Sequence, residues 1–241
     1  DDTDMPGTTG TGKLLQQMTR QMARYGLCTA SSISRHQLFV HRDVPFTSHN
    51  SAMCFEICPV QENIVEITDF IVDFIELRSQ KGSDPGLCIV PLAEGLDHGL
   101  LVEYGRRAKK EVLTKESAYD LADTLDIHLS EHGGTGQGVI GALAGAGLRL
   151  SGNDGRYRGW YELGRPGDVI RIDHLCEYDF VDDLVPAGGL SLKGQTHVHI
   201  GSERTKTVRI NGRQVIVLVE NDTFESQHAF RTITKQEAKI Y

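Results

Sequence analysis

Apolar side chains in the first third of the chain recur with two different periods. Residues 13–25 place an apolar side chain at every third or fourth position, and Gly26 follows where a helix commonly ends. Residues 37–42 and 52–59 are short runs of β-forming residues, and residues 62–80 return to the helical period. The pattern predicts the order helix, strand, strand, helix.

The next segments extend this order into a recognisable domain type. A polar break at residues 81–86 precedes a strand predicted over 87–90. Counting one further strand before Asp1, the elements follow the order βαββαβ, the split βαβ arrangement of ferredoxin-like domains. We expect residues 97–131 to be helical and residues 138–147 to form another short helix. The first 150 residues are therefore expected to form an α+β domain with added helices.

The pattern changes again in the last third of the chain. After a polar turn or linker at residues 151–159, apolar residues gather in short runs that predict strands. Asn211-Gly212 separates two of these runs and is a strong signal for a type I′ hairpin. We expect a smaller β-rich subdomain over residues 160–241. The predicted strands lie at residues 169–172, 197–200, 208–210 and 215–219.

Composition narrows the class of protein. With 241 residues the chain has room for two modest domains. Its five cysteines are scattered without a CxxC pair, which is typical of a reduced, cytoplasmic protein. No apolar run is long enough to span a membrane, and no signal peptide opens the chain. The net charge of −8 argues against tight, non-specific binding of nucleic acid.

The first thirteen residues combine carboxylates, hydroxyls, glycines and one lysine. Residues 7–13 satisfy the P-loop pattern GxxxxGK, but Leu14 stands where a P-loop has the Ser or Thr that holds Mg²⁺. In the alternative interpretation, carboxylates hold the metal and the glycine turn approaches phosphate. The third interpretation of this segment is an acidic, disordered N-terminus. The candidate metal ligands are Asp1, Asp2 and Asp4, and the candidate nucleotide contacts are Thr8, Thr9, Gly10, Gly12 and Lys13.

A second glycine-rich turn precedes the helix predicted at residues 138–147. Gly136, Gly138 and Gly141 match GxGxxG, but a helix precedes them where a dinucleotide fingerprint requires a strand. Free N–H groups at a helix start can still bind an anion, so Gly136, Gln137 and Gly138 are candidate nucleotide contacts. The alternative is that Gly141, Gly145 and Gly147 permit close helix packing. Both interpretations can hold at opposite ends of one helix.

Three other groups carry weaker signals. Arg156 and Arg158 flank an aromatic residue, and this loop could either clamp a phosphate or form a solvated turn. His197 and His199 share one face of a predicted strand without a third ligand, which favours ordinary surface histidines. A last set is expected on a solvated helix face: Asp123, Asp126, His128 and Glu131.

Four motifs occur in a distinctive order. They are DDTD at residues 1–4, VPFTSHNSA at 44–52, DPG at 84–86 and GQGVIGALA at 136–144. Their order resembles the N-terminal kinase-like domain of the archaeal tRNA-isoleucine agmatinylcytidine synthetases. The resemblance covers about residues 1–150, and the remainder does not match. Those enzymes use ATP to activate an anticodon cytosine by phosphorylation and then let agmatine displace the phosphate.

The resemblance implies roles for individual residues. Asp1, Asp2 and Asp4 would carry Mg²⁺ and position ATP, and Thr11 would be the phosphate-accepting threonine, with Thr8 and Thr9 as rivals. The substrate side would hold Ser48, His49 and Asn50. The chain also departs from the family pattern, with Gly10 in place of a cysteine and with Thr47 and His49 in place of a lysine and an arginine.

These observations lead to one functional hypothesis and two alternatives. We expect an ATP- and Mg²⁺-dependent phosphoryl-transfer or ligase-type enzyme whose acceptor is a small molecule or a nucleotide. The first alternative is a non-catalytic nucleotide- or phosphate-binding module. The second is a tRNA-modifying enzyme proper, which the acidic charge disfavours.

Overall fold

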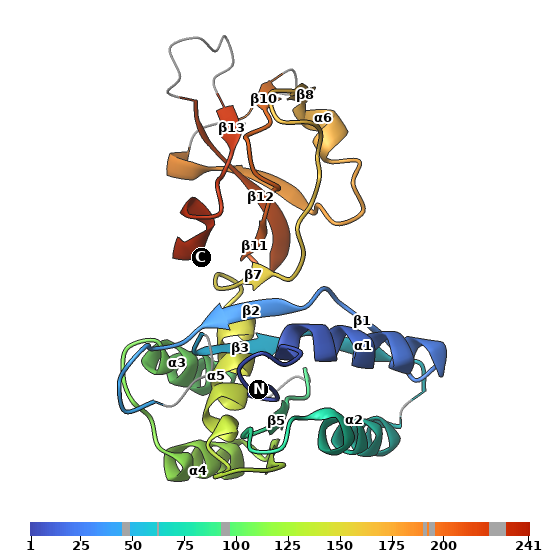
Figure 1. Ribbon diagram of the computed structural model, residues 1–241, viewed down its shortest axis with the longest axis vertical. Coiled ribbons are helices and arrows are strands. Elements are labelled where there is room, and N and C mark those ends of the chain that lie inside the picture. The colour runs from blue at the N-terminus through green and yellow to red at the C-terminus, as the bar shows by residue number, and fades with distance from the viewer. Residues whose placement is uncertain (45–48, 62, 93–96, 190–191, 193–195, 222–229) are drawn as a thin grey trace. The chain divides into compact units, whose positions relative to one another are not determined.

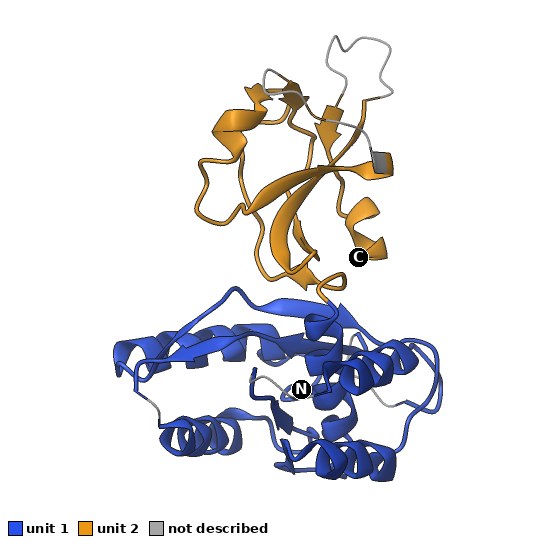
Figure 2. Ribbon diagram, turned by 180° about the vertical axis from the view of Figure 1, so that it is seen from behind, with its two compact units in different colours: residues 1–151 blue, residues 152–241 orange. Residues whose placement is uncertain are grey.

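The chain forms two compact units, residues 1–151 and residues 152–241 (Figure 2). The computed structural model describes all residues except 45–48, 62, 93–96, 190–191, 193–195 and 222–229. Helices and strands are mixed, which confirms the predicted α+β class. Within the described part of the chain, every helix is too short or too polar to cross a lipid bilayer.

Unit 1 contains five helices and six strands among its described residues (Figure 1). β1 pairs with β4, β2 with β3, and β5 with β6, all antiparallel. The elements are α1 (Thr11–Arg24), β1 (Cys28–Ala30), β2 (Ser34–Gln37), β3 (Ser51–Cys54), β4 (Ile57–Pro59), α2 (Ile64–Arg78), β5 (Gly86–Ile89), α3 (His98–Ala108), α4 (Lys115–Leu125), β6 (His128–Glu131) and α5 (Gly138–Leu150).

The N-terminal residues lie beside β5. The backbone N of Asp1 donates to the carbonyl of Gly86 at 2.7 Å, and the N–H of Gly86 donates back to the carbonyl of Asp1 at 3.1 Å. Two residues on, the carbonyl of Thr3 accepts a hydrogen bond from the N–H of Gln80 at 3.0 Å. These bonds anchor the DDTD segment, which precedes the turn that leads into α1.

Two apolar clusters hold unit 1 together. Leu14, Met18 and Met22 of α1 pack with Ile67, Ile71 and Phe74 of α2, as the helical spacing of both segments predicts. The other cluster joins α3, α4 and α5, and its fully buried side chains include Leu101 and Leu143. Unit 1 therefore has one apolar core at α1 and α2 and a second among α3, α4 and α5.

Glycines allow α5 to approach its neighbours at backbone distance. A Cβ atom at Gly147 would lie 1.9 Å from the carbonyl oxygen of Leu101 in α3, and one at Gly145 would lie 2.7 Å from the Cβ of Ala52 in β3. No side chain fits at such distances. The packing interpretation of these glycines is thus confirmed.

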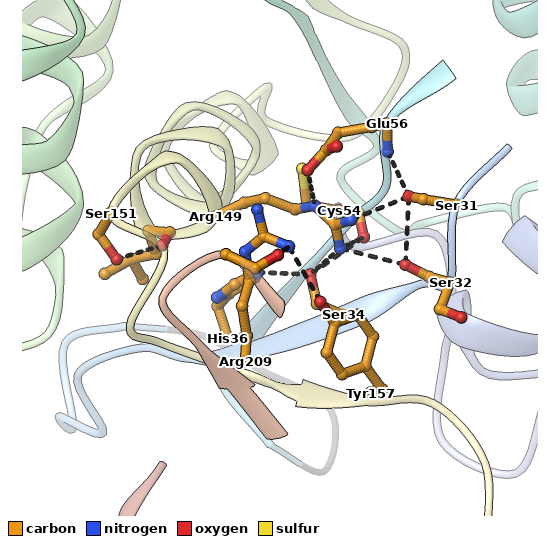
Figure 3. A network of polar contacts seen from close by, with 12 residues as sticks. Ser31, Ser32, Ser34, His36, Cys54, Glu56, Arg149, Ser151, Tyr157 and Arg209 are labelled. Carbon is orange, nitrogen blue, oxygen red and sulfur yellow. Dashed lines mark hydrogen bonds and ion pairs between the residues drawn. The ribbon is translucent and has the colours of Figure 1, made fainter. Parts of the chain in front are cut away.

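A buried arginine connects the end of α5 to the strands (Figure 3). Arg149 is 3% exposed. Its guanidinium donates to Glu56 Oε1 at 2.9 Å, to the hydroxyls of Ser34 and Ser31 at 2.8 Å each, and to the carbonyl of Ser32 at 3.1 Å. These bonds satisfy the polar groups that would otherwise be buried without partners.

Three predicted elements in unit 1 are wrong. The single strand predicted over residues 52–59 is two strands, β3 and β4, which pair with β2 and β1. The strand predicted over residues 37–42 lies earlier, because the β2–β3 ladder ends where Gln37 faces Ser51. The helix predicted to continue to residue 131 ends at Leu125. Asp126 caps it in the left-handed conformation, with φ of 51°, and residues 128–131 form β6. The acidic and histidine set expected on one helix face is therefore divided between a helix end and a strand.

Unit 2 is built around β12, its longest strand. The strands pair in the order β7, β11, β12, β13, β10, β8, and β9 adds a parallel pairing to β12. Asn211 and Gly212 both have positive φ, 50° and 76°, between β11 and β12, which confirms the predicted type I′ hairpin. The elements are β7 (Arg156–Tyr157), β8 (Val169–Arg171), α6 (Ile172–Leu175), β9 (Asp183–Pro186), η1 (Ala187–Gly189), β10 (His197–His199), β11 (Thr207–Ile210), β12 (Arg213–Glu220), β13 (Phe230–Thr232) and η2 (Glu237–Ile240).

Candidate functional site

A cavity of about 270 Å³ lies within unit 1, where the N-terminal segment meets the starts of α1 and α5. Its wall carries five aspartates, Asp1, Asp2, Asp4, Asp43 and Asp84, together with Glu111. The apolar side chains that line it are Leu38, Phe39, Val44, Met53, Ala108, Val112, Leu113 and Ile140.

Two helix N-termini contribute backbone to the same cavity. Residues 10–12 form the start of α1, residues 137–138 form the start of α5, and both segments line the cavity. The N-cap residues, Gly10 and Gln137, make no side-chain cap hydrogen bond. Helix N-termini carry partial positive charge and attract phosphate. Two helix starts that are about 125 residues apart in the chain thus line one cavity.

Asp2 lies in a polar but poorly solvated position. Its backbone has a positive φ of 52°. Burial is the main cause that raises the pKa of its carboxyl from the ordinary 3.8 to about 6; the N-terminal ammonium lowers this pKa, and the negative charges of Asp84 and Asp4 raise it. A carboxylate with such neighbours is stabilised by a bound proton or a bound cation.

The carboxylates fit Mg²⁺ only together with phosphate. Among the described residues, no three His, Cys, Asp or Glu side chains gather closely enough to hold a metal ion. The predicted ligands Asp1, Asp2 and Asp4 therefore do not form a closed set by themselves. Mg²⁺ commonly takes one or two carboxylates and fills its remaining positions with water and substrate phosphate oxygens. The donor set at this cavity suits that kind of site.

Thr11 is the first residue of α1 and lies at the cavity wall. Its hydroxyl donates to Asp4 Oδ1 at 2.8 Å, and its backbone N–H donates to the same oxygen at 3.3 Å. A hydroxyl bonded to a carboxylate has a partner that can take its proton. Among the threonines of the N-terminal turn, this geometry favours Thr11 as a nucleophile.

Several predicted contacts lie outside the cavity wall. Thr9 and the exposed Lys13 do not line it, and the hydroxyl of Thr8 closes a turn with the backbone of Met5. This placement favours the carboxylate interpretation of the N-terminal motif over a P-loop. On the predicted substrate side, His49 and Asn50 do line the cavity.

Ser48, together with Thr47, lies outside the described residues. Arg156 and Arg158 belong to unit 2 and are not among the residues that line this cavity. His197 and His199 both lie on β10 of the same unit, as the strand prediction placed them.

Gly136 has a structural role that the sequence did not reveal. Its N–H donates to Asp84 Oδ1 at 2.8 Å, and the N–H of Thr135 donates to the same oxygen. The glycine turn therefore wraps around the Asp84 carboxylate, and its N–H groups do not point to a phosphate. Of the second glycine motif, only Gln137 and Gly138 among the predicted contacts reach the cavity.

Arg35 is a cavity residue that sequence reasoning missed. It lies on β2 between the buried Ser34 and His36, so alternation along the strand directs it to the other face. Its Nε donates to Ser51 Oγ at 2.9 Å, and its side chain lines the cavity. Alternation of side chains along a strand can be predicted from sequence, but the face that Arg35 occupies follows only from the pairing of β2 with β3.

Comparison with solved structures agrees with the motif order. A tRNA fluorescent labeling enzyme is 25% identical, covers 61% of this chain and 34% of its own, and superposes with a TM-score of 0.52. A complex of TiaS with tRNA and ATP is 26% identical with the same coverage and TM-score. The resemblance to the agmatinylcytidine synthetases is confirmed. Apo TiaS, a tRNA agmatidine synthetase, shares the fold at 23% identity, with the same coverage and a TM-score of 0.50.

The similarity to TiaS is partial. This chain spans about a third of the length of the TiaS structures, and they cover 61% of it, which agrees with a match over its N-terminal part. No protein-family model matches the chain. No curated protein matches it either.

Proposed function

We propose that unit 1 binds ATP with Mg²⁺ at the cavity and transfers its terminal phosphoryl group, in ligase-type chemistry of the kind that modifies tRNA. The observation that carries this proposal is the meeting of five aspartates, two helix N-termini and the Thr11 hydroxyl at one cavity. The similarity to structures that hold tRNA and ATP supports both the nucleotide and the RNA acceptor. The net charge of −8 predicts that any RNA binding is weak away from specific contacts.

Phosphoryl transfer depends mainly on positioning and on neutralising charge. The starts of α1 and α5 would hold phosphate oxygens through backbone N–H groups. Arg35 adds a guanidinium on the β2 side of the cavity. Asp2 and Asp4 would hold Mg²⁺, which supplies positive charge to the phosphate oxygens when bound. The apolar wall that includes Phe39 and Ile140 would cover the base.

Thr11 is proposed as a transient phosphate acceptor. Its hydroxyl already has Asp4 as a hydrogen-bond acceptor at 2.8 Å. The resemblance to the synthetases supports this role, because it implies that Thr11 corresponds to their phosphate-accepting threonine. The phosphoryl group would then pass to the final acceptor in a second step.

Titration calorimetry with ATP and Mg²⁺ tests the nucleotide site. We expect saturable binding, and an Asp2→Asn, Asp4→Asn double variant should weaken it roughly 100-fold, or about 2.7 kcal/mol, because two metal-binding charges are lost at constant shape. The matched control is Asp69→Asn with Asp73→Asn, on the exposed face of α2, which removes the same charge far from the cavity. An absence of heat in the parent protein would remove the proposal.

A non-catalytic binding module remains the competing function. The observation that favours it is the replacement of a family cysteine by Gly10 directly beside Thr11. A pure binder would show the same calorimetric saturation without turnover. Release of ADP, AMP or pyrophosphate in the presence of tRNA or amines therefore separates the two functions.

A further inference from the structure

We propose that Thr3 is a positioning residue that directs the proton of the Thr11 hydroxyl to Asp4, a role that rests on the proposed function. Thr3 is 2% exposed and lies between two of the cavity aspartates in the chain. Its Oγ1 lies 3.0 Å from Thr11 Oγ1, and its backbone N lies 3.3 Å from the same oxygen.

The direction of each hydrogen bond follows from the chemistry of the groups. An ionised carboxylate only accepts, so the single hydroxyl proton of Thr11 is given to Asp4 Oδ1 at 2.8 Å. Thr11 Oγ1 has no second proton, so the hydroxyl of Thr3 must donate to it. The backbone N–H of Thr3 can only donate as well. The chain of donors therefore runs from Thr3 to Thr11 to Asp4.

This arrangement matters at the moment of phosphoryl transfer. The step forms a bond between Thr11 Oγ1 and the γ-phosphorus, breaks the bond from that phosphorus to ADP, and moves the hydroxyl proton to Asp4, from which solvent removes it. The electron pair of the broken O–H bond forms the new bond to phosphorus, because both lone pairs of Thr11 Oγ1 already accept from Thr3. Negative charge builds on this oxygen as its proton leaves. Both donors of Thr3 already point at that oxygen, which is the geometry that stabilises a developing oxyanion.

The backbone around Thr3 is held in place from two sides. The N–H of Gln80 donates to its carbonyl at 3.0 Å, and the hydrogen bonds between Asp1 and Gly86 fix the residues just before it. A side chain anchored in this way does not have to reorganise when the reaction occurs. Valine would fill the same volume as Thr3 without burying a polar group. The hydrogen bond to Thr11 therefore explains why a hydroxyl is found at this buried position.

The test compares Thr3→Val with Thr3→Ser in the full chain. Each variant is incubated with radiolabelled ATP and Mg²⁺, and the rate of phosphate incorporation at Thr11 is followed by peptide mass spectrometry. We expect Thr3→Val to lower the rate at saturating ATP by at least about 10-fold. Its half-saturating ATP concentration and unfolding temperature should stay close to those of the parent. Thr3→Ser, which keeps the hydroxyl, should recover most of the rate.

The outcomes separate this role from the proposed function. If Thr3→Val incorporates phosphate at Thr11 as fast as the parent protein does, the role of Thr3 is overturned and the proposed function is left intact. A Thr3→Ser variant as slow as Thr3→Val would also overturn it, because packing and not the hydroxyl would then be responsible. If the parent never carries phosphate at Thr11, both the phosphoenzyme and the role of Thr3 fall together.

Discussion

Gly138→Ala is expected to weaken the binding of Mg²⁺–ATP by at least about 10-fold and to destabilise unit 1 by about 1–3 kcal/mol. A Cβ atom at Gly138 would lie 1.8 Å from the carbonyl oxygen of Asp84 and 2.8 Å from the N of Gly86. Both neighbours are backbone atoms and cannot rotate away. The start of α5 must therefore move away from β5, and the cavity wall formed by residues 137–138 must move with it.

Gly10→Ala is the matched control for this variant. Gly10 also lines the cavity at a helix start, but a Cβ atom there would meet only Asp4 Oδ2, at 4.0 Å. Its φ of −64° suits any residue. Calorimetry and urea unfolding should show Gly10→Ala close to the parent. Equal losses in both variants would mean that the approach of α5 to β5 does not shape the site.

Arg149→Met should destabilise unit 1 by about 3 kcal/mol, the larger of the two stability losses, because hydrogen bonds from a charged donor are lost. Methionine keeps much of the volume but removes every guanidinium donor. The hydroxyls of Ser31 and Ser34 and the carbonyl of Ser32 would each lose a partner, and Ser34 is fully buried. Ser34 keeps His36 and the carbonyl of Cys54 as partners, so the cost comes from the loss of several hydrogen bonds from a charged donor.

The cost should arise from the lost hydrogen bonds of the guanidinium more than from the ion pair itself. The Glu56 side chain is 40% exposed, so water can solvate its charge when the arginine is gone. We therefore expect Glu56→Gln to cost less than about 1 kcal/mol. Hydrogen exchange read by mass spectrometry on α5 peptides assigns the effect to unit 1. A loss for Glu56→Gln as large as that for Arg149→Met would contradict this account.

The sequence predicted best those features that neighbouring residues determine. The stripe that begins at Leu14 predicted α1 to within two residues at its start, and Asn211-Gly212 predicted the hairpin between β11 and β12. The aspartates of residues 1–4 were found because they are adjacent in the chain. Each of these signals is local, and the conformation that it predicts is the one found in the structure.

Features set by tertiary contacts escaped prediction. Gly136 matched a phosphate motif, but its N–H is directed by Asp84, 52 residues away. The helix after residue 115 was extended too far because β6 owes its strand conformation to pairing with β5. Arg35 and Thr3 were missed for the same reason, since one needs a strand register and the other a contact with Thr11. No local pattern encodes those partners.

The protonation state of the Asp2 carboxyl tests directly whether the cavity binds a metal together with phosphate. Its pKa of about 6 exceeds the ordinary 3.8, so the protonated form favours the folded state. This contribution to stability is complete below about pH 4 and is lost as the pH rises through about 6. A bound cation should replace the proton and bring the pKa back down.

A carboxyl ¹³C NMR titration of Asp2, without and with Mg²⁺ and a non-hydrolysable ATP analogue, is therefore the most direct test. We expect a pKa of about 6 for the protein alone, and a value below about 4 with both ligands present, because the positive charge favours the ionised form. Mg²⁺ alone should shift the pKa less, since phosphate completes the ligand set. A pKa that the nucleotide and Mg²⁺ leave unchanged would contradict the assignment of this cavity as the phosphoryl-transfer site.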